Sequence, residues 1–184
     1  MLVRYNPEGD RELNQRQATR LRVLSDWLHE RERKFLFELL VPAETHQLES
    51  VGGSKARFDA ELRPALVVQT MRELQGAGVE PDIWKIEGFE SRQDCVDAAA
   101  QARSGGRDDV VCVVLGRGAD ESKVLHWLEQ GAGVPGYVGF AVGRTLWWNE
   151  LVGYVAGDIS RIDAATRIAR NYQALIDAYT RSDA

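Results

Sequence analysis

The chain has 184 residues, of which 44% are hydrophobic and 28% are charged, and its formal net charge is −5. This length and composition suit one globular domain with a substantial core. The charge is mildly negative and no block of like charges occurs, so a nucleic-acid partner is not expected. No apolar run is long enough to span a bilayer and no signal peptide is visible, so we expect no membrane association and a cytoplasmic location.

The residues that most often bind metals are few and scattered. Cys95 and Cys112 do not have the spacing of a metal site, and they are typical of buried thiols in a reducing compartment. His29, His46 and His126 lie far apart along the chain. We therefore expect no metal and no cofactor.

The first third of the chain predicts two strands, one helix and a loop. Residues 2–5 are typical of the end of a strand, and residues 12–33 predict a helix with leucines on one stripe. Residues 34–42 form a nearly continuous apolar run, as expected for a strand covered on both sides. Residues 45–59 contain Gly52-Gly53 and no clear period, and they are predicted to be a long loop. The leucines of the predicted helical stripe are Leu13, Leu21, Leu24 and Leu28.

The rest of the chain alternates between helical and strand patterns. Pro64 marks a helix start, and Ser91 is a plausible N-cap. Helices are predicted over residues 65–75, 92–102, 121–130 and 163–179. Strands are predicted over residues 82–87, 110–115 and 137–142.

This alternation predicts an α/β fold with five parallel strands. The pattern alone fits either an open doubly wound sheet or part of a barrel. No Gly-x-Gly-x-x-Gly follows the first strand, which argues against a dinucleotide-binding fold.

Two charged residues lie in the strand that follows Pro81. Side chains alternate across a strand, so Ile83, Lys85 and Glu87 should face one way and Trp84 and Ile86 the other. Buried charges are costly unless they are paired or used in chemistry. A structural ion pair is the plain interpretation, and a lysine nucleophile is the functional one.

A lysine in apolar surroundings can supply the chemistry of a Schiff base. Burial disfavours the ammonium form, and the neutral amine can attack a ketone. The resulting iminium accepts electrons when the adjacent carbon–carbon bond breaks, and a carboxylate must move protons. Glu38, in the preceding strand, and Glu87 are the candidate carboxylates.

Glycine and arginine follow the last two predicted strands, as Gly116-Arg117-Gly118 and as Gly143-Arg144. Glycine allows close approach of a ligand to the backbone, and arginine suits phosphate. These residues are therefore the candidate phosphate site, as in many (β/α)8 barrels. The alternative is that Arg117 and Arg144 pair with carboxylates at the rim.

Four segments together resemble a known family. They look like the aldolase-like domain fused behind the 5-dehydro-2-deoxygluconokinase of myo-inositol catabolism, which is similar to class I tagatose-1,6-bisphosphate aldolases. The segments are residues 37–42, 84–88, 114–118 and 139–144. The resemblance implies a (β/α)8 TIM barrel, with Lys85 as the Schiff-base lysine, Glu38 as acid and base, and Arg144 as a phosphate ligand.

In that family the matching lysine lies on the sixth strand. The resemblance therefore implies that residues 1–184 are a single partial barrel domain, covering roughly the fourth to eighth βα units. A partial barrel would expose apolar surface, so we expect association with a second copy or with a carbohydrate kinase domain.

The expected function is cleavage of a phosphorylated keto sugar acid by a class I aldolase. The resemblance implies 6-phospho-5-dehydro-2-deoxy-D-gluconate as substrate, with dihydroxyacetone phosphate and malonate semialdehyde as products. Glu87 would orient or tune Lys85. A non-catalytic sugar-phosphate binding module that regulates a kinase, and an inactive barrel fragment, remain alternatives.

Overall fold

The structure is a computed structural model that describes residues 1–181, so the last three residues of the predicted domain lie outside the described part. It is an α/β protein with one five-stranded sheet in the order β1-β2-β3-β4-β5, and all neighbouring strands are parallel. The five parallel strands predicted from the sequence are thus confirmed. The strands are β1 (Leu2–Arg4), β2 (Leu36–Leu40), β3 (Ile83–Glu87), β4 (Val111–Leu115) and β5 (Tyr137–Phe140).

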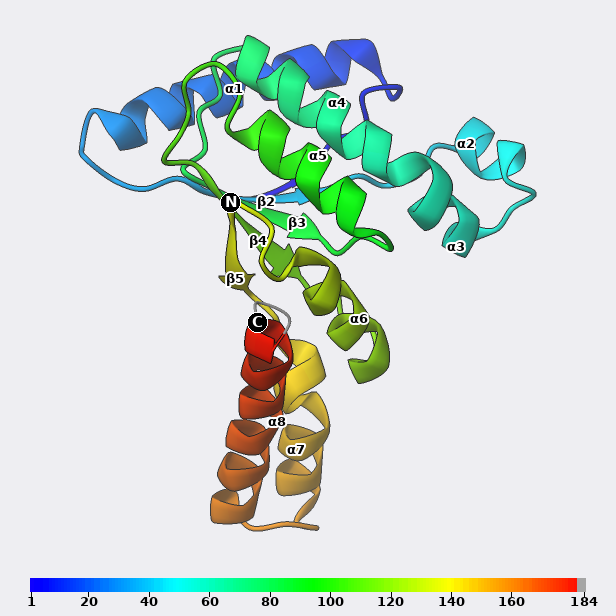
Figure 1. Cartoon of the computed structure of the whole chain (residues 1–184), viewed down its shortest axis with the longest axis vertical. Coiled ribbons are helices and arrows are strands. Elements are labelled where there is room, and N and C mark those ends of the chain that lie inside the picture. Colours follow the sequence, from blue (N-terminus) through cyan, green and yellow to red (C-terminus); the bar gives the residue numbers. More distant parts are fainter. Residues whose placement is uncertain (182–184) are drawn as a thin grey trace.

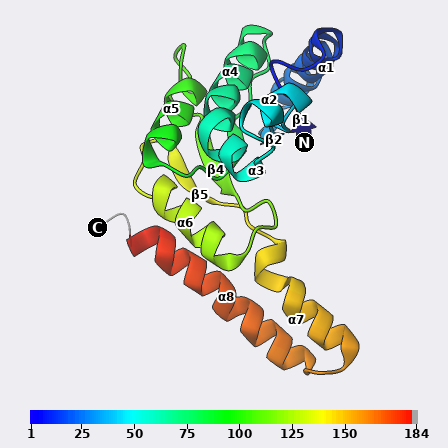
Figure 2. The ribbon, with the colours of Figure 1, turned by 90° about the vertical axis from the view of Figure 1, so that its right-hand side faces the viewer.

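Helices follow the strands in chain order, and α1, α4, α5 and α6 line up along one side of the sheet (Figures 1 and 2). A right-handed crossover between sequential parallel strands puts each helix on the same side. The helices are α1 (Arg11–His29), α2 (Thr45–Ser50), α3 (Lys55–Arg57), the π-helical turn η1 (Phe58–Leu62), α4 (Arg63–Gly76), α5 (Arg92–Ala102), α6 (Glu121–Gly131), α7 (Arg144–Ala156) and α8 (Arg161–Arg181).

The core lies between the helices and one face of the sheet. Alternate strand residues are fully buried there, including Phe37, Trp84 and Cys112. The rings of Phe37 and Trp84 pack with their centroids 4.9 Å apart, which ties β2 to β3. This aromatic contact sets which face of each strand points away from the helices.

The opposite face of the sheet carries the other set of side chains. Leu2, Leu36 and Val138 are exposed on it, while Lys85 and Val113 are partly buried. Within the described residues no helix covers this face (Figure 2). The predicted alternation in β3 is confirmed, because Trp84 and Ile86 are buried whereas Ile83 and Lys85 are not.

Several local predictions are confirmed. Ser91 caps α5 by accepting a hydrogen bond from the Asp94 amide, and α5 has the predicted bounds. Pro64 lies in the first turn of α4, where its missing N–H costs nothing. Cys95 and Cys112 are free, buried thiols, and burial raises the pKa of each to about 12.

The prediction of a long loop at residues 45–59 is wrong. The segment contains α2 and α3 and runs into η1. A capping box between Glu44 and Gln47 starts α2, and Ser54 caps α3 through the Arg57 amide. These short polar caps stabilise single turns that have no hydrophobic period, which is why the pattern missed them.

The predicted helix at residues 12–33 is shorter in the structure. The chain leaves the helix after His29 and turns through Glu32, whose φ is 53°. Leu13 was expected on the core stripe, but it is exposed in the first turn of α1. Only the later part of the stripe, from Ala18 onward, reaches the sheet.

Helix α7 was not predicted at all. Its apolar residues are spread around the helix rather than gathered on one face, and only Leu146 is buried. The sequence therefore shows no single apolar face with a helical period. In residues 1–181 no helix combines the length and the apolar character needed to cross a bilayer.

Gly88 ends β3 where the chain passes directly over the indole of Trp127. A Cβ built at residue 88 would overlap that ring. We expect Gly88→Ala to destabilise the protein by about 1–3 kcal/mol, because the core must move to admit the methyl group. Urea titration checks this, with Gly76→Ala as control, since no atom lies within 4 Å of a Cβ there. An equal effect of both substitutions would contradict the expectation.

Candidate functional site

Lys85 and Glu38 form an ion pair on the uncovered face of the sheet. They are register partners on β3 and β2, and Lys85 Nζ lies 2.8 Å from Glu38 Oε2. Their side chains are only 18% and 21% exposed. A lysine amine thus lies in hydrogen-bond contact with a carboxylate in a partly desolvated position.

Glu87 lies two residues further along the same face, at the carboxyl end of β3. It is buried, and its Oε1 lies 2.9 Å from Arg117 Nη1. Its Oε2 accepts a hydrogen bond of 3.3 Å from the Val41 amide. Glu87 is therefore held by Arg117 and the backbone, and in the described chain no hydrogen bond or ion pair joins it to Lys85.

Arg117 pairs with a second carboxylate that the sequence reading did not single out. Its two terminal nitrogens each donate to one oxygen of Asp59 at 3.1 Å. This is the rim ion pair that was the alternative to a phosphate contact. A fork-to-fork pair of this kind fixes the guanidinium plane as well as its position.

Arg63 is the other residue that sequence reasoning missed. It is fully buried, and its Nε lies 3.2 Å from Asp59 Oδ1. Its terminal nitrogens donate to the carbonyl oxygens of Glu87 at 3.3 Å and of Gly88 at 2.6 Å. Arg63 therefore holds the end of β3, and with it Glu87, against the start of α4.

The π-helical turn η1 brings Asp59 and Arg63 to this place. Residues 59 and 63 are four apart, which puts them on one side of a helix. The i, i+4 spacing of Lys55, Asp59 and Arg63 was visible in the sequence. It went unused because the segment was expected to be a loop.

The electrostatics of Asp59 reflect two opposed effects. Burial alone would raise the pKa of its carboxyl group, but the hydrogen bond from Arg117 and the charges of Arg63, Arg117 and Lys55 outweigh it. The pKa is therefore lower than the usual 3.8. The carboxylate form is the one that the folded protein stabilises.

This shift predicts a pH dependence of stability. Because the folded pKa is lower than the unfolded pKa, the contribution is complete above about pH 4 and is lost as pH falls through the folded value. We expect the difference in unfolding free energy between wild type and Asp59→Asn to shrink on acidification below pH 4. Urea titrations at several pH values measure it. A difference that stays constant would contradict the assignment.

The loop Gly116-Arg117-Gly118 is a tight turn with unusual backbone angles. Arg117 has φ of 51° and Gly118 has φ of 72°, and the Ala119 amide donates to the Gly116 carbonyl at 2.9 Å. A left-handed conformation costs a non-glycine residue about 1–3 kcal/mol. The ion pairs of Arg117 hold it there, so the turn carries strain close to the polar end of the sheet.

Arg144 opens α7 beside this turn. It is exposed, and the end of its side chain lies against the turn, since a Cβ at residue 118 would lie 2.9 Å from its Nη2. The N-cap Gly143 has no side-chain hydrogen bond, and Thr145 Oγ1 donates to the Ala119 carbonyl at 2.8 Å. A cavity of about 530 Å³ lies here, lined by Gly118, Ala119, Asp120, Glu121, Arg144, Thr145, Trp148 and Asn149.

Arg144 differs from Arg117 in its partners. Among residues 1–181 the Arg144 side chain forms no ion pair and donates no hydrogen bond, whereas Arg117 is held by Asp59 and Glu87. The predicted phosphate residues thus lie together at the ends of β4 and β5. One of the two arginines is available to an anion, at an open helix N-terminus.

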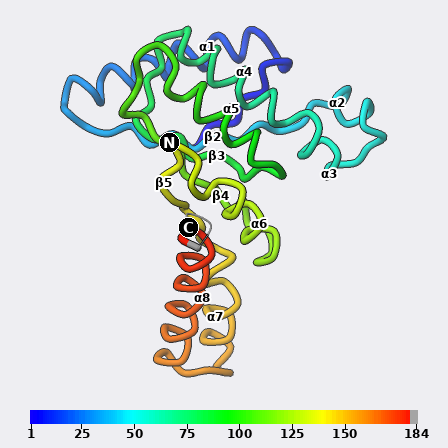
Figure 3. The backbone as a smooth tube through the Cα atoms, in the orientation of Figure 1, coloured from blue at the N-terminus to red at the C-terminus, as the bar shows by residue number. Residues whose placement is uncertain are grey.

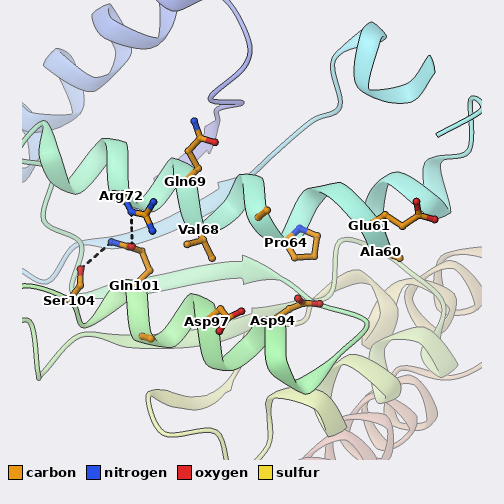
Figure 4. Close-up of a pocket in the computed structure, with 12 residues that line it drawn as sticks. Ala60, Glu61, Pro64, Val68, Gln69, Arg72, Asp94, Asp97, Gln101 and Ser104 are labelled. Atoms are coloured by element: carbon orange, nitrogen blue, oxygen red, sulfur yellow. Dashed lines mark hydrogen bonds between the residues drawn. The ribbon is translucent and has the colours of Figure 1, made fainter. Parts of the chain in front are cut away.

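Another cavity lies on the helical side of the molecule, away from Lys85. It has a volume of about 740 Å³ and occupies the groove between α4 and α5 (Figure 4). Its polar groups have partners within the groove or beside it, since Arg72 bonds Gln101 at 3.2 Å, Gln101 bonds Ser104 at 3.0 Å and Gln69 bonds Glu73 at 3.0 Å. We interpret it as a surface groove between packed helices.

The sheet order and the charged side chains at its carboxyl ends define an α/β protein with a polar site on the open sheet face. The chain belongs to the family described as "Uncharacterized protein conserved in bacteria (DUF2090)", which matches residues 1–183. No curated protein matches the chain.

Proposed function

We propose that the protein is a class I aldolase in which Lys85 forms the Schiff base. The observation that carries this proposal is the 2.8 Å contact between Lys85 Nζ and Glu38 Oε2 on the open sheet face. The pair places a primary amine beside a proton acceptor, and both side chains keep about a fifth of their surface exposed. Lysines paired with carboxylates are common on protein surfaces. On a largely buried strand face, however, such a pair carries a desolvation penalty, which favours a functional role for it.

The chemistry starts with transfer of a proton from the Lys85 ammonium to Glu38. The neutral amine attacks the substrate ketone, and loss of water leaves a protonated imine. A carboxylate then removes the proton of the hydroxyl group on that carbon of the breaking bond which lies farther from the imine. The bonding electrons pass to the iminium nitrogen, which releases an aldehyde and leaves an enamine. Protonation of the enamine and hydrolysis return the amine.

Glu38 is the carboxylate for these proton transfers, because its oxygen already lies on Lys85. Glu87 has both oxygens engaged, by Arg117 and by the Val41 amide. Its role is to fix the polar end of β3 next to the lysine.

The phosphate of the substrate would bind at Arg144 and the backbone of Gly116, Gly118 and Gly143. The free guanidinium and the uncapped start of α7 both favour an anion. Arg117 supports this site by holding the 116–118 turn in shape rather than by meeting phosphate itself, because Asp59 and Glu87 engage it.

We further propose that the five strands are the fourth to eighth strands of a (β/α)8 barrel. Sequential strand order, with helices on one face and polar groups at the carboxyl ends, supports this reading. On the motif resemblance, the substrate would be 6-phospho-5-dehydro-2-deoxy-D-gluconate of myo-inositol catabolism. Its cleavage would yield dihydroxyacetone phosphate and malonate semialdehyde.

The direct test is a borohydride trap. The protein is incubated with dihydroxyacetone phosphate, reduced, and mapped by peptide mass spectrometry. The chain has four lysines, and Lys34, Lys55 and Lys123 are 42–78% exposed, against 18% for Lys85. Random glycation therefore favours the other three. An adduct confined to Lys85 supports imine chemistry, and adducts that follow exposure contradict it.

A non-catalytic sugar-phosphate binding module is the second candidate. The free Arg144 at the α7 N-terminus favours it, since anion binding there needs no lysine. The Lys85→Met variant separates the two functions. A binding module keeps its affinity for phosphosugars and shows no turnover in either form, whereas an aldolase loses turnover.

A further inference from the structure

Helices α7 and α8 form a hairpin that projects from the rest of the molecule (Figures 1 and 3). Helix α8 returns to the body, where it contacts α6, and Tyr172 packs edge-on against Phe140 of β5 at 5.7 Å. Helix α7 packs mainly on α8. The hairpin is therefore anchored at its base by α8, and α7 forms its outer part.

One side of α7 packs closely against α8. Asn171 of α8 donates to the Leu146 carbonyl at 3.0 Å, and Arg167 of α8 approaches Glu150 at 3.7 Å. A Cβ at Gly153 would lie 3.5 Å from Ile159, in the turn between the two helices. Leu146 is buried at the base of the hairpin. This face accounts for the contact between the two helices.

A second apolar stripe runs along α7 away from these contacts. We call it the α7 seam, and it consists of Trp148, Leu151, Val152 and Val155, all of which are exposed. The spacing i, i+3, i+4, i+7 puts these side chains on one side of the helix. A seam of this spacing is the pattern by which one helix packs against another.

The exposed apolar surface continues at the tip of the hairpin. Tyr154 and Ile162 are also exposed there. Together with the α7 seam they present on the order of 600–700 Å², close to the roughly 800 Å² that each partner buries in a standard interface. Patches of this size on a soluble protein mark interaction sites.

We propose that the α7 seam packs against the same seam of a second copy of this chain. Two hairpins would form a four-helix bundle around a two-fold axis, with each seam facing its equivalent. The exposed apolar area of the seam and the hairpin tip together approaches the roughly 800 Å² that each partner buries in a standard interface. The seam itself contains no charged residue, and on α7 only Arg144 and Glu150 are charged, so this helix offers no net charge to a charged partner or to an anionic lipid surface.

The test compares oligomeric states by light scattering coupled to size-exclusion chromatography over a dilution series. Wild type is expected at twice the chain mass of 20.6 kDa, and Val152→Glu at the single chain mass. The matched control is Val23→Glu on α1, a valine that is 66% exposed against 50% for Val152. This control is expected to remain a dimer.

Val155→Glu guards against a folding defect, because Val155 is 76% exposed within its own chain. It should give the same monomer as Val152→Glu, with the far-UV circular dichroism of wild type. The proposal is overturned if wild type is monomeric throughout the series, or if both seam variants remain dimers. Co-sedimentation of a monomeric wild type with phosphatidylglycerol vesicles would instead assign the seam to a membrane.

Discussion

On the proposed mechanism, Lys85→Met is expected to abolish carbon–carbon bond cleavage, with turnover falling at least about a thousandfold, because none of the other three lysines lies on a strand of the sheet. Methionine keeps the length and the apolar stem of lysine, so β3 should stay folded. Release of dihydroxyacetone phosphate, followed with a coupled reductase, measures the loss. The affinity for the phosphosugar should change little, because the proposed phosphate site lies at Arg144 rather than at Lys85.

The control for this variant is Lys123→Met. Lys123 also pairs with a glutamate, Glu90, at 2.6 Å, but it lies on α6 rather than on the open face of the sheet. It should leave turnover within a few-fold of wild type. If both variants lose activity equally, or if neither does, Lys85 is not the nucleophile.

Arg63→Met is expected to lower the free energy of unfolding by about 3–5 kcal/mol, which makes it the largest effect on stability that we predict. The side chain is fully buried and holds three acceptors: the Asp59 carboxylate and the carbonyl oxygens of Glu87 and Gly88. Methionine leaves the two carbonyl oxygens without this donor and removes one of the cations beside Asp59, which keeps its hydrogen bonds from Arg117. Urea titration followed by circular dichroism gives the value.

Two further variants bracket that result. Arg57→Met removes an exposed i, i+4 pair with Glu61 and should cost only a few tenths of a kcal/mol. Arg63→Lys keeps the charge but cannot reach all three acceptors at once, so it should fall between the two. A cost for Arg63→Met as small as that for Arg57→Met would contradict a structural role for the buried guanidinium.

Much of the sheet could be predicted from the sequence because its strands are strongly patterned. The apolar runs around Phe37, Trp84 and Cys112 are short, bounded by turn residues, and separated by helical periods. Their alternation was enough to assign the two faces of β3. Helix α7 could not be found in this way, since its apolar residues surround the helix and leave no single face to detect.

The candidate site was predictable only where it lies on strands. Lys85 and Glu38 became neighbours because parallel pairing joins strands that follow each other, and the register then aligned them. Asp59 and Arg63 reach the site through a π-helical turn, and because this segment has no hydrophobic period, their i, i+4 spacing alone did not distinguish it from a loop. The pairing of Arg117 depends on Asp59 and was therefore equally invisible, although a carboxylate partner for it was an open alternative.

The segment that holds α2, α3 and η1 has a consequence for how this protein can change. It lies between two strands whose facing residues, Glu38 and Lys85, are 47 positions apart. Closing a longer loop costs little, about 0.6 kcal/mol for each doubling of its length. Insertions at the exposed turn Gly52-Gly53 would therefore leave the sheet almost unaffected, while they change the surface beside Glu87. Changes in the length of this turn can therefore alter the surface around the polar end of the sheet while the fold stays the same.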